Sequence, residues 1–150
     1  MTKSNGSRVD QMILLEVVGI YEWLDREILQ AATNAACRQC GRCCDFEAFG
    51  HRLFVTTPEW LYFRHMLGEQ TMLPMPSGRC PYNQEGLCTV HAIRFSGCRI
   101  FACQLDAQAQ SELTESAIAR LKAVCVKSGL PYQYVDLASA LNGRLTDIGL

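Results

Sequence analysis

The stretch VDQMILLEVVGIYEWLDREILQAATN, residues 9–34, decides the fold class of this chain. Its apolar residues recur at spacings of three and four, which is the repeat of one face of an α-helix. This series consists of Ile13, Val17, Ile20, Leu24, Ile28 and Ala31. The pattern predicts a long helix with one apolar face, preceded by a loose polar start at residues 1–8.

A second helical pattern lies in the last third of the chain, at residues 111–128, SELTESAIARLKAVCVKS. Ser111 is a suitable N-cap, and Gly129 followed by Pro131 is a typical stop signal. Its apolar stripe consists of Leu113, Ala117, Leu121 and Val124. Two long helices are therefore expected near the two ends of the sequence.

The remaining segments predict shorter elements. Residues 51–56, HRLFVT, favour an extended segment, and the following TPEWLYFRHML favours a helix capped by Thr57 and stopped at Gly68. Residues 69–90 contain three prolines and two glycines and indicate a loop. A last short helix is expected within residues 132–142.

The composition indicates one small domain spanning residues 1–150, with about half of its residues hydrophobic. Lys and Arg number 14 against 15 Asp and Glu, so the charge gives no reason to expect nucleic acid or a membrane as a partner. The N-terminal apolar stretch is interrupted by Glu16 and lacks a signal-peptide pattern. We expect a cytoplasmic protein whose thiols are kept reduced.

Nine cysteines stand out in this composition, and eight of them fall within residues 37–103. CRQCGRCC (37–44) holds the first four, and CPYNQEGLCTVHAIRFSGCRIFAC (80–103) holds the others. Disulfides, unligated thiols and metal ligation are the alternatives, and the reducing compartment favours metal ligation. The predicted ligands are Cys37, Cys40, Cys43, Cys44, Cys80, Cys88, Cys98 and Cys103. The predicted fold is therefore mainly α, with helices flanking an irregular, metal-stapled centre.

The spacing of the first cluster has a physical reason. Two residues between ligands allow a tight turn that brings both sulfurs to one ion, and Gly41 supports such a turn. The side chains of Cys43 and Cys44 point apart in an extended stretch, so the pair serves two metals more easily than one. Either the cluster is split between two sites or one of the pair bridges them.

Arginine accompanies the cysteines. Residues 37–103 contain seven arginines and no lysine. Eight thiolates carry more negative charge than two divalent ions neutralise, and arginines next to ligands can offset that charge and hydrogen-bond sulfur or carbonyl groups. The arginines closest to ligands in sequence are Arg38, Arg42, Arg79 and Arg99.

The order of these motifs resembles that of the CxxCxxCC family of zinc- or iron-chelating domains. The likeness runs from CRQCGRCC through the Thr-Pro-Glu helix start to the C-x7-C-x9-C-x4-C pattern, and it covers residues 37–103. In the downstream half, the positions that match the family are Arg94, Cys98, Arg99 and Phe101. Phe95 replaces a usual proline, and His91 stands where tyrosine is common. The resemblance implies metal chelation and supplies no substrate or reaction.

Three interpretations of the function remain open. Zinc bound by four-cysteine sites would staple the centre, and the expected cofactor is zinc or iron. An iron–sulfur cluster is the alternative, because the run from Cys37 has ferredoxin-like spacing and Pro81 follows Cys80. A thiol enzyme or a metal-trafficking protein is the third. His91 and Asp45 are further candidate ligands, a metal ion is the expected partner, and no protein partner is indicated.

Overall fold

The computed structural model describes residues 2–31, 53–68, 72–76, 79–85, 87–100 and 106–144. The predicted mainly helical fold is confirmed, and helices flank the cysteine-rich middle on both sides. The helices are α1 (Thr2–Ala31), α2 (Thr57–Leu67), α3 (Ser96–Ile100), α4 (Ala107–Ser128) and α5 (Leu137–Ser139). The strands are β1 (Phe54–Thr56), β2 (Asn83–Gln84), β3 (Leu87–Cys88) and β4 (Tyr134–Asp136). No described helix is both long enough and apolar enough to cross a membrane.

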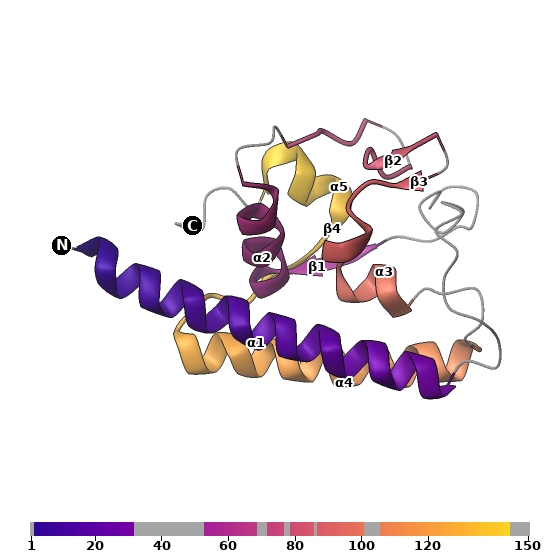
Figure 1. Cartoon of the computed structure of the whole chain (residues 1–150), viewed down its shortest axis with the longest axis horizontal. Helices are drawn as coiled ribbons and strands as arrows, with labels where there is room; N and C mark the ends of the chain where they lie inside the picture. Colours follow the sequence, from indigo (N-terminus) through magenta and orange to yellow (C-terminus); the bar gives the residue numbers. More distant parts are fainter. Residues whose placement is uncertain are drawn as a thin grey trace.

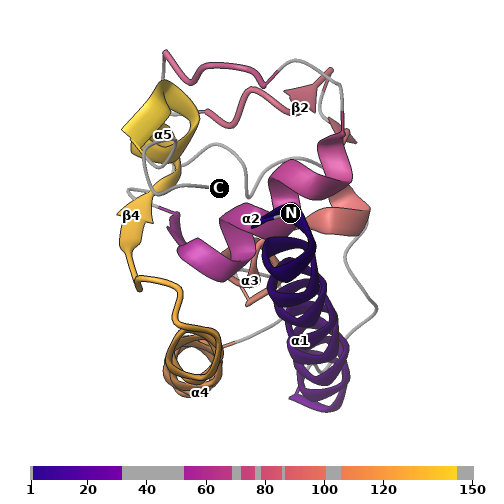
Figure 2. The ribbon, with the colours of Figure 1, turned by 90° about the vertical axis from the view of Figure 1, so that its left-hand side faces the viewer.

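The two long helices α1 and α4 lie side by side and run antiparallel (Figures 1 and 2). Lys127 Nζ donates to Glu16 Oε1 at 2.8 Å, and the guanidinium of Arg120 lies 3.9 Å from the ring centre of Trp23. The apolar stripes of both helices meet α2 in one buried cluster. This cluster contains Ile13, Val17, Ile20, Tyr21, Leu61, Tyr62, Leu121 and Val124.

A second core lies on the other side of α2. Strand β1 pairs antiparallel with β4, with Val55 opposite Val135, and leads directly into α2. Trp60 and Phe63 of α2 are fully buried and pack with the ring of Phe95. Figure 2 shows α2 between the long helices and the segments that include β2 and α5. The helix α2 therefore joins the two cores.

Several predicted boundaries were wrong. Residues 2–8 continue α1 rather than forming a loose start, because no proline stops the helix from propagating beyond its periodic segment. Helix α4 begins at Ala107, and its N-cap is Asp106, whose Oδ1 accepts from the Ala109 amide at 2.7 Å. The residues before Ser111 are good helix formers, so they extend the helix upstream of the predicted cap.

Other predictions named the correct type of helix end or element but not always its exact position. Thr56, and not Thr57, precedes α2 as its N-cap. The stops at Gly68 and Gly129 are confirmed, with φ angles of 62° and 77° that favour glycine. The predicted last helix begins as strand β4, followed by α5 and a π-helical turn at Ala140–Arg144.

Candidate metal centre

The described residues contain three of the eight predicted ligands. These are Cys80, Cys88 and Cys98. The other five predicted ligands lie outside the described residues, and these are Cys37, Cys40, Cys43, Cys44 and Cys103. The candidate ligand Asp45 lies outside the described residues as well. The ninth cysteine, Cys125, is buried on α4, with its sulfur 3.7 Å from Thr57 Oγ1, as expected for a cysteine that packs as a small apolar residue.

Cys80 and Cys88 are held by one small hairpin. In the antiparallel pair of β2 and β3, Asn83 lies opposite Cys88. The Asn83 amide donates to the Cys80 carbonyl at 3.1 Å, and the Thr89 amide donates to the Tyr82 carbonyl at 2.8 Å. The hairpin therefore brings together two cysteines that are eight positions apart in the sequence. The predicted loop over residues 69–90 is corrected to this extent, since two short strands form within it.

Cys98 comes to the same region from α3. Its side chain packs against the buried cluster that contains Cys80. Burial raises the pKa of the Cys98 thiol, and the nearby sulfurs of Cys80 and Cys88 raise it further, while Phe95 and Arg94 oppose the shift. The three cysteines are therefore neighbours. Across the described ranges, no three or more His, Cys, Asp or Glu side chains are arranged so that they could hold a metal ion.

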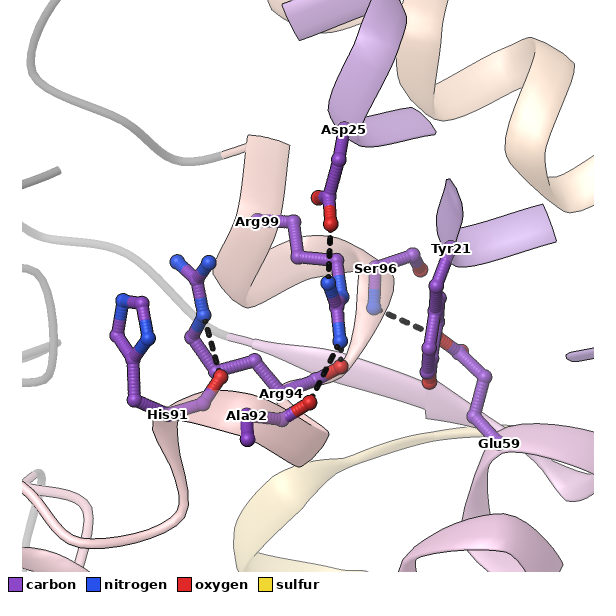
Figure 3. Close-up of polar contacts among 8 residues, drawn as sticks. All are labelled: Tyr21, Asp25, Glu59, His91, Ala92, Arg94, Ser96 and Arg99. Atoms are coloured by element: carbon purple, nitrogen blue, oxygen red, sulfur yellow. Dashed lines mark hydrogen bonds and ion pairs between the residues drawn. The ribbon is translucent and has the colours of Figure 1, made fainter. Parts of the chain in front are cut away.

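Arginines fix the chain that connects Cys88 to Cys98 (Figure 3). Arg99 Nε donates to the Arg94 carbonyl at 3.0 Å, and one of its terminal nitrogens donates to the Ala92 carbonyl at 3.3 Å. Arg94 Nε in turn donates to the His91 carbonyl at 3.0 Å. Arg99 therefore hydrogen-bonds backbone carbonyls, one of the contacts expected of it, while its expected role beside a metal ligand stays a prediction. We call residues 79–85 and 87–100 the cysteine-bearing segment.

Glu59 is a buried acid at the junction of four elements, with 1% of its surface exposed. Its Oε1 accepts from the Ser96 amide at 2.6 Å and from the Tyr21 hydroxyl at 3.1 Å. Its Oε2 accepts from the amide and hydroxyl of Thr56 at 3.2 and 2.9 Å. Four donors surround the carboxylate, so its burial is compensated by hydrogen bonds. Glu59 thus ties α1, β1 and α2 to the first residue of α3, two positions before Cys98.

From the sequence, Glu59 could be placed only at the start of a helix, with no sign of its partners Tyr21 and Ser96. Its partners Tyr21 and Ser96 lie 38 and 37 positions away. One signal was available, because a Thr followed three residues later by Glu is a capping-box pattern. That pattern accounts for the contacts with Thr56 but not for those with Tyr21 and Ser96.

His91 has a buried nitrogen that remains unused within the described part of the chain. Its Nε2 is inaccessible to solvent and has no hydrogen-bond partner there. Burial, followed by the charges of Arg94 and Arg99, lowers the pKa of His91. A neutral imidazole with a free ring nitrogen is the form that binds metals. His91 nevertheless does not complete a ligand set with the described cysteines.

Comparisons of the chain with family models, with curated proteins and with solved structures found no match. Functional arguments therefore start from the chain's own residues. The arrangement provides one buried and two partly buried thiols that are neighbours, on a hairpin and a short helix, next to two arginines. Its chemical capacity is to donate sulfur ligands.

Proposed function

We propose that this protein binds zinc or iron through its eight clustered cysteines, in a structural role or one related to metal or redox chemistry. The observation that carries the proposal is the proximity of Cys80, Cys88 and Cys98, which come from a hairpin and from a helix start. These elements have little periodic packing of their own. Three neighbouring thiols do not form a ligand set by themselves, and in this proposal the remaining predicted cysteines complete the four-sulfur sites.

The donor chemistry fits this proposal. Cys80 is 8% exposed, and burial, followed by the neighbouring sulfurs of Cys80 and Cys88, raises the pKa of the Cys98 thiol. A bound ion would stabilise the thiolates and repay the cost of bringing several sulfurs together. Thiolate ligands favour zinc and iron over harder ions such as magnesium or calcium. In the proposed site, the described cysteines bind together with Cys37, Cys40, Cys43, Cys44 and Cys103.

The chain's own residues would act on the site in two ways. The hairpin hydrogen bonds set the positions of Cys80 and Cys88, and Glu59 and Arg99 set the position of α3 with Cys98. The positive charges of Arg94 and Arg99 would partly offset the excess negative charge of the thiolates. The metal, when bound, would supply the cross-link between segments that lack a periodic core.

Membership of the CxxCxxCC family and residence in the reducing cytoplasm belong to the same proposal. The support for the first is the order and spacing of the eight cysteines in the sequence. The second belongs with it because thiols stay reduced in that compartment and so remain able to bind a metal ion.

The alternative is an iron–sulfur protein that acts in electron transfer, in redox sensing or as part of a redox enzyme. Pro81 directly after Cys80 and the C-x2-C-x2-C run are the observations in its favour. An iron–sulfur cluster would make the purified protein brown, and dithionite would bleach the colour. A colourless protein with stoichiometric zinc would favour the first form of the proposal.

The test is elemental analysis of protein purified without oxygen, combined with absorption spectroscopy. Cys98→Ser is expected to lower the metal content, because it removes a ligand from the proposed set. Cys125→Ser is the matched control, since it alters a buried cysteine outside that set and should leave the metal content unchanged. A wild-type protein without metal and with nine reactive thiols would overturn the proposal.

A further inference from the structure

Arg99 combines several contacts that few side chains could make together. The residue is 7% exposed, and its guanidinium serves two backbone carbonyls and one carboxylate at once. The carboxylate is that of Asp25 on α1, whose Oδ2 lies 2.7 Å from a terminal guanidinium nitrogen. The guanidinium also stacks on the ring of Tyr21, with 4.1 Å between its carbon and the ring centre. Figure 3 shows these groups converging on the side chain from α1 and from the loop.

The two carbonyls lie in the segment that joins two predicted ligands. Ala92 and Arg94 are both within the nine residues between Cys88 and Cys98. Arg99 is itself the neighbour of Cys98 in the chain. A single side chain therefore contacts the backbone at two points between the hairpin and α3, and so constrains the separation of the two cysteines.

The contact with α1 adds a second constraint. The helix α3 has only five residues and cannot hold its orientation through its own hydrogen bonds. The ion pair with Asp25 and the stack on Tyr21 attach it to the long helix. Only a planar, five-donor group meets both carbonyls, the carboxylate and the ring together, and a lysine ammonium cannot reproduce that geometry.

We propose that Arg99 is a positioning residue for the proposed metal centre: it sets the geometry of Cys88 and Cys98 by fixing the loop between them and by attaching α3 to α1. This inference rests on the proposed metal-binding function. Arg99 touches no metal in this role and acts through the backbone that carries the ligands.

The test uses the full-length protein loaded with cobalt(II), whose absorption bands report the geometry of thiolate ligands. Arg99→Lys keeps the charge but loses the forked donor, and we expect it to release cobalt to a chelator about 10- to 100-fold faster. Its cobalt absorption bands are expected to shift as well. The matched control is Arg120→Lys, which removes another guanidinium stacked on an α1 ring, that of Trp23, on a helix without predicted ligands. It should keep the wild-type release rate and spectrum.

A second variant covers the case in which Arg99→Lys does not fold. Asp25→Asn weakens only the attachment to α1, at a side chain that is half exposed, and should accelerate release to a smaller extent. Wild-type release and wild-type spectra in the folded Arg99→Lys protein, or in Asp25→Asn if only that variant folds, would overturn the inference while leaving metal binding intact. A wild-type protein that binds no cobalt and contains neither zinc nor iron after purification without oxygen would overturn the proposed function, and the inference with it.

Discussion

The α1–α4 pair and the cysteine-bearing segment are stabilised in different ways. The long helices bury regular stripes of aliphatic residues, and Val17 and Leu121 are 0% exposed. In the cysteine-bearing segment, a two-residue strand pair, arginine–carbonyl hydrogen bonds and one buried carboxylate set the geometry. Many equivalent apolar contacts stabilise the first region, whereas in the second a few polar side chains fix short elements that are also anchored by buried Tyr82 and Phe95.

This difference explains why the cysteine-bearing segment needs further stabilising interactions in addition to side-chain packing. Short elements such as α3 and the β2–β3 pair are not stable by themselves. Glu59 and Arg99 attach them to the helices, and the proposed metal would cross-link them. Perturbations that act on one region and spare the other test this contrast.

Metal removal should have the largest effect on stability, and this effect should be confined to the cysteine-bearing segment. Structural zinc typically contributes on the order of 10 kcal/mol, so a chelator should open the cysteine-bearing segment while α1 and α4 stay helical. Amide hydrogen exchange measures this directly, at the amides of Asn83, Thr89 and Arg99 against those of the long helices. Equal loss of protection in both regions would contradict the contrast.

Glu59→Ala should have the next largest effect, because Glu59 joins the two regions. The substitution leaves the donors of Tyr21, Thr56 and Ser96 buried and unpaired, and we expect a loss of about 4 kcal/mol in unfolding free energy. Glu59→Gln keeps the size and one acceptor oxygen and should cost about half as much. Urea denaturation measures both variants, and equal stability of the two would show that the hydrogen bonds contribute little.

Leu121→Ala tests the helical region alone. Leu121 of α4 is fully buried against α1 and α2. The cavity left by its substitution should therefore lower the unfolding free energy by about 3 kcal/mol. The metal content of the folded protein should not change, since the cluster around Leu121 contains no predicted ligand. Loss of metal at temperatures where the variant is still folded would show that the regions are more tightly coupled than proposed.

Tyr21→Phe should have the smallest effect, with a distinct dependence on pH. Loss of the hydrogen bond to Glu59 should cost about 1.5 kcal/mol at neutral pH. Burial, and then the Glu59 carboxylate, raise the pKa of Tyr21 well above its ordinary value of 10.0, while Arg99 opposes the shift. The neutral phenol therefore contributes its full stabilisation below pH 10, and the contribution is lost as the pH rises above that value. Denaturation from pH 8 to 11 should show a steeper loss in the wild type than in Tyr21→Phe.

Prediction from the sequence succeeded where periodicity was strong. The stripes of α1 and α4 were read from apolar spacing, and Gly68 and Gly129 end their helices as predicted. Boundaries were less accurate, because alanine and glutamine before Ser111 extended α4 and no proline stopped α1 ahead of its periodic segment. The pairing of β1 with β4 was not predicted, since three-residue strands 80 positions apart leave no local signal.

The candidate site could be predicted by residue type but not by arrangement. Cysteine spacing identified candidate ligands, and the structure brings Cys80, Cys88 and Cys98 near one another. The supporting contacts of Glu59 and Arg99 depend on long-range packing, and nothing in the sequence joins Tyr21 to Glu59 or Asp25 to Arg99. Such contacts become visible only once the helices are placed.

The pairing of α1 with α4 has a consequence for how the chain is made. Lys127 and Glu16, which join the two helices, are 111 positions apart. During synthesis α1 leaves the ribosome before α4, and α4, which covers much of its apolar stripe, follows only after the intervening segments. Until then, among the described residues, only α2 and the partly buried Ile93 from between the two long helices can contribute to that cluster. Helix α1 is therefore made well before its apolar stripe is fully buried.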